Sequence, residues 1–318
     1  MKKLLVLFVL VSGGCFSQVS PGEINYLKSP ENREITDVNE PFLPRNVSWV
    51  NKEYGAVRTE VSILDYYLFL SFLRYAPGGF KDPVSGEKLM LKTCFPDLGE
   101  VEGKVQPLWE ALIAGLSDSL HQEVATEIMA DFFNKIKVKV PLKLDPKQRE
   151  LAAFPVTGIS HEAATKYAIW LSYMYRTYFS EGDSYSWEFQ LPTEDQWEEL
   201  ANAGLGEKMR QNQVLDSVNA EGCFLFNYAN LPDCKSMPGY LKSSRGGGAA
   251  PVSSFNADFI GLHNVFGNVA EMIATKGVCK GGSYEHKAYQ AKIPVEIRYS
   301  HPQPWLGMRL IAIPVSIR

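Results

Sequence analysis

Apolar residues recur with helical spacing in two parts of the chain and alternate with charged residues in a third. From Ser62 to Leu73 nearly every position is aromatic or aliphatic, which predicts a helix buried on all sides. Between Leu108 and Phe133, leucines recur at helical spacing and predict one or two amphipathic helices. From 135 to 140, lysine alternates with isoleucine or valine, which predicts a strand with one solvated face.

Two further helices are predicted by their capping residues. Ser160 precedes a stripe of small residues, and Glu162 places a carboxylate in the first turn, where it suits the helix dipole. Thr193 and Gln196 have the spacing of a capping box, and Gly204 is a natural end for that helix. The inward face of the second helix is expected to consist of Trp197, Leu200 and Ala201.

The rest of the chain is mostly irregular in pattern. Residues 18–44 are polar and rich in Pro and Asn, which predicts an extended lead-in, and residues 77–102 read as loops. Beyond 204, Gly, Asn and Ser are frequent and apolar runs are short. We therefore expect little regular structure there, with backbone groups satisfied by disulfides, metal ions or dense hydrogen bonding.

The amino end has the order of a secretory signal. Lys2 and Lys3 precede an apolar run, Leu4–Val11, and small residues follow. Residues 1–17 are therefore predicted to be a signal peptide, and the apolar run is too short to span a bilayer. Two processing alternatives remain: lipidation of Cys15 as in bacterial lipoproteins, or cleavage after Ser17. The expected location is the periplasm or outer membrane for the lipoprotein and a secreted soluble form for the cleaved chain.

Composition narrows the classes of function. Hydrophobic residues make up 45% of the chain and aromatic residues 12%, enough for a sizeable core. The net charge of −4 and the lack of a basic stripe argue against nucleic-acid binding. A membrane contact is expected only through a lipid anchor.

Four cysteines follow the signal segment: Cys94, Cys223, Cys234 and Cys279. An exported chain allows disulfides, and none of the four has CxxC spacing. A bridge between Cys223 and Cys234 is one alternative, and four small buried residues is the other.

Five segments, in this order, resemble one known family. They are Pro155–Ser160 (PVTGIS), Leu191–Glu198 (LPTEDQWE), Gly261–Glu271 (GLHNVFGNVAE), Lys280–Tyr284 (KGGSY) and Trp305–Leu310 (WLGMRL). Together they resemble the domain of formylglycine-generating enzyme, also called sulfatase-modifying factor, and Glu60-Val61-Ser62 fits an early element of that family. The resemblance implies an α+β, C-type-lectin-like fold over 45–318, low in regular secondary structure, with a helical insertion at about 77–150.

The resemblance also bears on metal chemistry. The copper-dependent oxidases of the family use two cysteines near the end of the domain, because paired thiolates hold Cu(I). The matching stretch, 290–298, has no cysteine, and Cys279 lies earlier and alone. The resemblance therefore implies no catalytic residue and no bound copper in this chain.

Calcium, unlike copper, is still implied by the resemblance. In the family, the run from Asn264 to Glu271 wraps one ion, with an amide oxygen and a carboxylate at its ends and carbonyls of Gly267 and Val269 between them. The alternative is that Asn264 and Glu271 tie down loop backbone without an ion.

The sequence and the family resemblance leave three hypotheses for the function. The first is an exported, non-catalytic binding or scaffold module whose partner is an envelope protein or a secretion or motility component. It is favoured because the cysteine pair is missing and Cys15 is a candidate for lipidation. In addition, residues 267–271 are most similar to Bacteroidota gliding-motility and secretion lipoproteins of the family. The second is a divergent formylglycine-generating-type oxidoreductase using Cys279. The third is a glycan-binding module in which Trp305 or Tyr284 would stack on sugars.

Overall fold

The computed structural model describes residues that lie between 46 and 316. The described residues are 46–75, 80–83, 85–89, 91–94, 153–179, 185–205, 226–229, 248–255 and 257–316. The predicted signal, lead-in, amphipathic helices at 108–133 and strand at 135–140 lie outside them. Within these ranges no helix is both long and apolar enough to cross a bilayer.

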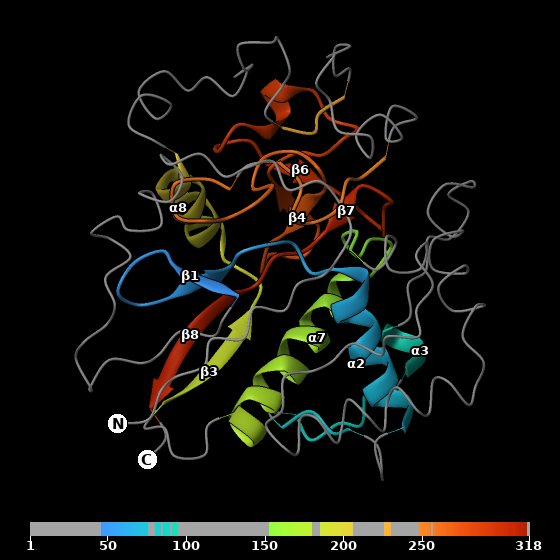
Figure 1. The fold of residues 1–318 in the computed structure, drawn as a ribbon. Helices are drawn as coiled ribbons and strands as arrows, with labels where there is room; N and C mark the ends of the chain where they lie inside the picture. Colours follow the sequence, from blue (N-terminus) through green and yellow to red (C-terminus); the bar gives the residue numbers. More distant parts are fainter. Residues whose placement is uncertain are drawn as a thin grey trace, which may run out of the picture. The chain divides into compact units, whose positions relative to one another are not determined.

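The first sheet joins the two ends of the described chain. Its strands β1 (Val47–Trp49), β2 (Gly55–Val57), β8 (Ile311–Ser316) and β3 (Tyr185–Gln190) lie in the order β1-β2-β8-β3 and are all antiparallel. Figure 1 shows β8 between the early strands and β3. The last strand therefore holds the first hairpin against the middle of the chain.

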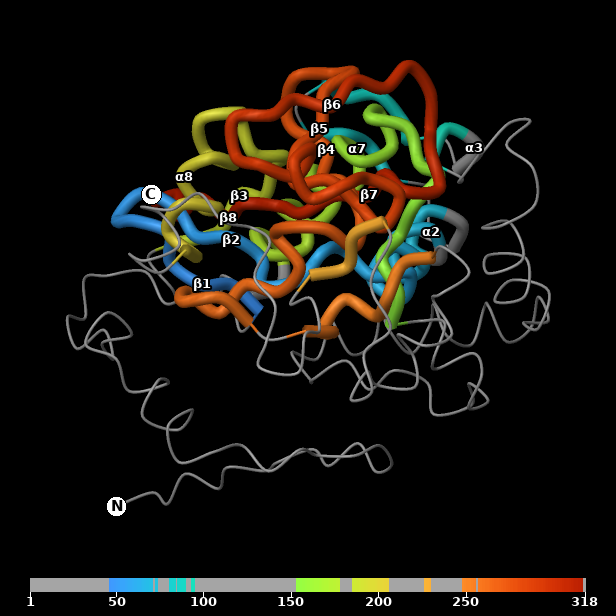
Figure 2. Tube along the Cα trace, turned by 90° about the horizontal axis from the view of Figure 1, so that it is seen from above, coloured from blue at the N-terminus to red at the C-terminus, as the bar shows by residue number. Residues whose placement is uncertain are grey.

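The second sheet is built from very short strands. They are β6 (Ile297–Arg298), β5 (Val278–Lys280), β4 (Ala270–Met272) and β7 (Leu306–Gly307), in the order β6-β5-β4-β7. The β4–β7 pair is parallel and the other two pairs are antiparallel. In Figure 2, β4, β5 and β6 lie together, away from the strands of the first sheet.

Helices α2 (Ile63–Tyr75) and α7 (His161–Met174) lie side by side next to the first sheet (Figure 1). The π-helix η2 (Tyr175–Phe179) continues α7, and α8 (Glu194–Gly204) follows β3. Two single-turn elements complete the set, α3 (Leu91–Cys94) and the 3₁₀ helix η4 (Ala288–Ala291). The prediction of a buried helix at 62–73 is confirmed. The loop expected over 77–102 contains α3, a helix too short to leave a periodic pattern.

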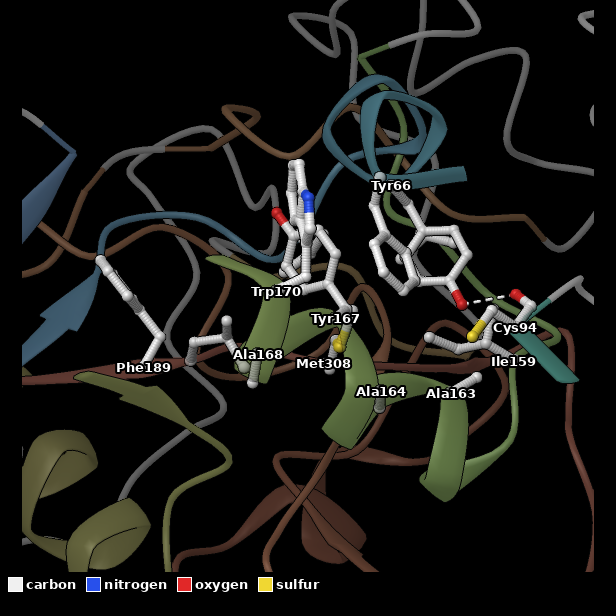
Figure 3. Packing of buried hydrophobic residues seen from close by; sticks show 14 of the residues in the cluster. Tyr66, Cys94, Ile159, Ala163, Ala164, Tyr167, Ala168, Trp170, Phe189 and Met308 are labelled. Atoms are coloured by element: carbon white, nitrogen blue, oxygen red, sulfur yellow. Dashed lines mark hydrogen bonds between the residues drawn. The ribbon is translucent and has the colours of Figure 1, made fainter. Parts of the chain in front are cut away.

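Aromatic rings from α2 and α7 pack together within the larger of the two core clusters (Figure 3). Phe69 packs against Tyr167 and Trp170, with ring centroids 5.7 and 5.3 Å apart. Figure 3 shows Ala163 and Ala164 of α7 beside this cluster, and both are fully buried. Small residues let other elements approach α7 closely, as the stripe in the sequence predicts.

The caps of α7 and α8 form as predicted. The Ser160 hydroxyl accepts the N–H of Ala163 at 3.1 Å. The Thr193 hydroxyl accepts the N–H of Gln196 at 3.3 Å, and the Gln196 side chain accepts the N–H of Thr193 at 2.9 Å. The helix ends at Gly204, although the glycine is required for a different reason than the one predicted. A Cβ there would lie 1.9 Å from a carboxylate oxygen of Asp258, so any other residue would have to displace the Asp258 side chain.

Two backbone positions at the margins of the first sheet cannot pair with another strand. The outward N–H of Phe189 in β3 donates to the hydroxyl of Ser172 at 2.8 Å, so a side chain of α7 covers that edge. On the other side, β8 runs beyond its last pairing with β2 at Ala312. Leu310 and Ala312 face β2, and Pro314 is the next residue on the same side of β8. Proline has no N–H, so it cannot donate a hydrogen bond to another strand there. Blocked edges of this kind prevent pairing with other chains.

Candidate functional site

Residues from several of the motif segments, together with Glu60 and Asn227, form a buried polar cluster. Its charged and amide members are less than a tenth exposed: Glu60, Asn227, Asn264, Asn268, Glu271, Lys280 and Arg309. Glu60 follows β2, Glu271 lies in β4, and Arg309 lies between β7 and β8. Buried charges are stable only when paired and hydrogen-bonded, so their partners decide what the cluster can do.

Arg309 and Glu271 form the central ion pair. The Nε and Nη2 atoms of Arg309 lie 2.9 and 2.7 Å from the same oxygen of Glu271, and both side chains are fully buried. The other Glu271 oxygen accepts the indole N–H of Trp197 at 2.8 Å. Arg309 also donates to the carbonyls of Val57 at 2.9 Å and His263 at 2.6 Å. Every oxygen of Glu271 therefore has a strong protein donor.

Glu60 is held by two carboxamides from the motif loop. Asn268 donates to one Glu60 oxygen at 2.8 Å, and Asn264 donates to the other at 3.2 Å. The Asn268 amide oxygen accepts the N–H of Ala250 at 2.7 Å, and its nitrogen also donates to the Ala250 carbonyl at 3.1 Å. These backbone partners fix the orientation of the Asn268 amide, with its N–H groups toward Glu60.

Lys280 ties two of the motif segments together. Its ammonium group is fully buried and lies 3.0 Å from Glu194 and 2.6 Å from Glu198, one turn apart on α8. It also lies 6.0 Å from the ring centroid of Trp197. The segment that begins at Lys280 is thereby fixed to α8 by charge as well as by packing.

The two described cysteines are free and buried. Burial raises the pKa of Cys94 to about 11. Burial also raises the pKa of Cys279 well above its ordinary value, and the Cys279 thiol lies 3.4 Å from the carbonyl of Ile297. A raised pKa disfavours the thiolate, which is the form that binds metals and reacts. Cys15, Cys223 and Cys234 lie outside the described residues.

The family model of the sulfatase-modifying factor enzyme 1-like domain matches residues 6–313. The chain belongs to this family. Its α+β, C-type-lectin-like fold, expected from the five motif segments, is thereby confirmed. No protein in the search of curated proteins matches the chain.

The solved structures that are similar to the chain include three proteins with low sequence identity. Treponema denticola variable protein 1 is 13% identical over 85% of this chain and 91% of its own, with a TM-score of 0.41. CarF is 17% identical over 83% of this chain and 87% of its own, with a TM-score of 0.40. PvdO from Pseudomonas aeruginosa is 16% identical over 51% of this chain and 63% of its own, with a TM-score of 0.33.

The contacts at the predicted calcium residues do not fit a calcium ion. Calcium binds through oxygens, but both Glu271 oxygens accept N–H groups, and a buried guanidinium lies against one of them. Asn264 turns its amide nitrogen to Glu60 and to the carbonyl of Val252. Gly267 and Val269 are buried beside them. Nowhere in the described ranges do three His, Cys, Asp or Glu side chains form a metal-binding group. The alternative, in which Asn264 and Glu271 hold loop backbone, fits these contacts better.

The aromatic residues named for glycan stacking are engaged within the domain. Tyr284 is buried, and the ring of Trp305 packs edge-on against His286 with centroids 4.7 Å apart. The large apolar side chains that the structure leaves most exposed are Phe259 (54%) and Tyr289 (62%). Neither was predicted, because a single exposed aromatic residue leaves no pattern in a sequence.

Proposed function

We propose that this protein is an exported, non-catalytic member of the family that serves as a binding or scaffold module at the cell envelope. In this proposal Cys15 carries a lipid anchor, and the partner is an envelope protein, such as a secretion or gliding-motility component. Neither copper nor calcium is needed for the role. The divergent oxidoreductase is the competing function.

The burial and raised pKa of Cys279 are the observations that support a non-catalytic function. The family's oxidases need two thiolates at one copper ion, whereas Cys279 is fully buried, has a raised pKa and bonds to a backbone carbonyl. Cys94 is the last residue of α3, and the Tyr66 hydroxyl donates to its carbonyl at 2.6 Å (Figure 3). These two cysteines are therefore packing residues in their present surroundings.

The base of the predicted insertion supports the binding role. Phe80, Leu89 and Cys94 fall in the segment assigned to that insertion, and all three are buried in the core cluster that contains residues of α2 and α7. The rings of Phe80 and Tyr173 pack edge to face with centroids 4.9 Å apart. Asp82, which is only 3% exposed, accepts from Lys166 at 3.2 Å. A firmly anchored base is what a segment that presents a binding surface requires. The boundaries of the insertion stay a prediction.

Metal titration separates the scaffold from the enzyme. We expect the reduced mature protein to lose a competition for Cu(I) against a chromophoric chelator, because Cys279 offers one buried thiol. We also expect excess EGTA to leave the thermal midpoint unchanged, because the Glu271 oxygens already have protein donors. Stoichiometric Cu(I) binding that disappears in Cys279→Ser would overturn the non-catalytic proposal. Cys223→Ser with Cys234→Ser is the control for copper bound elsewhere.

Partner capture tests the scaffold part. Residues 95–152 would be replaced by a Gly/Ser linker of equal length, which keeps the anchored base at 80–94. We expect photo-crosslinking in intact cells to lose the envelope partner in this variant while the thermal midpoint of the domain stays close to that of the parent. Asp82→Asn, which weakens the pair with Lys166 without removing the segment, is the matched control. If crosslinking were undiminished after the replacement, the insertion would not be the surface that binds the partner.

A further inference from the structure

The turn formed by residues 258–262 is held closed by the side chain of Asp258. One oxygen of this side chain, Oδ1, accepts the N–H groups of Ile260 and Leu262 at 3.0 and 2.8 Å. The Asp258 N–H donates to the carbonyl of Leu262 at 2.8 Å, and the Gly261 N–H donates to the carbonyl of Asp258 at 3.1 Å. The closed turn therefore requires Asp258 to stay in this position.

The second oxygen of Asp258, Oδ2, is buried without a partner. Asp258 as a whole is half-buried, but Oδ2 is shielded from water and has no hydrogen-bond partner within the residues that the structure describes. This oxygen lies against the end of α8, where a Cβ on Gly204 would be 1.9 Å from it. A buried charge that is not fully hydrogen-bonded is unfavourable, so the closed turn favours a protonated, uncharged carboxyl group.

We propose that the turn 258–262 is a pH-sensitive switch, closed on α8 while Asp258 is protonated and more readily opened once Asp258 is ionised. The turn carries Phe259, which is 54% exposed and whose N–H donates to the carbonyl of Gly204 at 3.1 Å. Opening would break this bond and free the start of the motif segment at Gly261 from the end of α8. The inference is independent of the proposed scaffold role, because it requires neither the insertion nor a partner.

The pKa of Asp258 supports the switch and gives its sign. Burial raises this pKa from 3.8 to about 6, and backbone hydrogen bonds and the charge of Arg309 lower it by less. Opening the turn exposes the carboxyl group to water and returns its pKa toward 3.8. The closed form thus binds more protons between these two values, and its advantage over the open form falls as pH rises through this window.

The charged groups around the turn leave one competing titration. Neither the last turn of α8 (residues 201–204) nor β1, which approaches Gly261, contains a charged residue. Arg309 and Arg58 keep their charge throughout this pH range. Burial lowers the pKa of His263, whose N–H donates to the carbonyl of Arg58, from its ordinary value of 6.5. The His263 titration can overlap that of Asp258, so a variant at Asp258 is needed to separate them.

Direct titration of Asp258 in the intact mature protein is the first test. With ¹³C-labelled aspartate, we expect one side-chain carboxyl resonance to titrate with a midpoint near pH 6. It should be absent in Asp258→Asn and present in Asp195→Asn, which makes the same change at an exposed position of α8. If Asp258→Asn does not fold, the resonance is assigned through bonds in the parent protein. A midpoint for Asp258 below about pH 4.5, close to that of an ordinary aspartate, would overturn the proposal.

Hydrogen exchange tests whether the charge opens the turn. Between about pH 4 and pH 7, we expect the protection factors of the Phe259 and Leu262 amides to fall by up to about 100-fold, because each unit between the closed-form and open-form pKa changes the opening equilibrium tenfold. The fall should follow the midpoint of the Asp258 resonance and be absent in Asp258→Asn, which cannot ionise. Constant protection factors in the parent would overturn the switch. An equal fall in Asp258→Asn would also overturn it and would assign the pH dependence to His263.

Discussion

Replacing Arg309 by methionine is expected to remove much of the stability of the domain. Methionine keeps a similar length but leaves the fully buried Glu271 carboxylate without its counter-charge and the carbonyls of Val57 and His263 without donors. Removing one partner of a buried ion pair costs about 3–5 kcal/mol. A whole domain is stable by only about 5–15 kcal/mol. The measurement is the free energy of unfolding from urea denaturation at pH 7.

An exposed arginine provides the matched control for this variant. Arg298 pairs with Glu296 at 3.2 Å, and 80% of its side chain is exposed. Because exposed ion pairs contribute little, Arg298→Met should unfold at the same urea concentration as the parent. If Arg309→Met and Arg298→Met had equal midpoints, the central pair would not hold the motif segments together. The double change Arg309→Met with Glu271→Leu should recover part of the loss, because it removes the stranded carboxylate.

The helices and their caps were predictable because the interactions that define them are local. The ring of apolar residues in α2, the Ser160 cap and the Thr193–Gln196 box each involve residues within one or two turns. Such patterns can be read from a single sequence. The capping interaction of Ser62 with Asp65 at the start of α2 has the same local nature and was overlooked, since Asp replaces the more usual Glu or Gln.

The partners in the buried cluster could not be predicted from one sequence. Glu271 and Arg309 are 38 positions apart, and Glu60 and Asn268 are 208 positions apart. No periodicity connects them, and strands such as β6 and β7 have only two residues each. Asn264 and Glu271 lie in one motif segment, but Arg309, the partner of Glu271, lies in another, Trp305–Leu310. The resemblance alone did not indicate that these two segments meet through this ion pair.

Replacing Gly281 by alanine is expected to have the second large effect. Gly281 has a φ of +86°, and a Cβ there would lie 2.6 Å from the carbonyl oxygen of Val265 and 3.1 Å from the Trp197 ring. The nearest obstacle is backbone, which cannot rotate away as a flexible side chain could. Backbone strain and overpacking each cost about 1–3 kcal/mol. We therefore expect a fall in the free energy of unfolding comparable to that for Arg309→Met.

A substitution at Gly86 is the control that separates backbone strain from overpacking as causes of the lost stability. It has a positive φ of +72°, yet a Cβ at this position would meet no atom within 4 Å. Gly86→Ala should therefore cost only the conformational term, about 1–2 kcal/mol. The excess cost of Gly281→Ala measures the close approach of the Lys280-Gly281-Gly282 segment to the motif loop. If the two variants lost equal stability, this segment would tolerate a methyl group, and the close contact between the two family motifs would not contribute to the stability of the cluster.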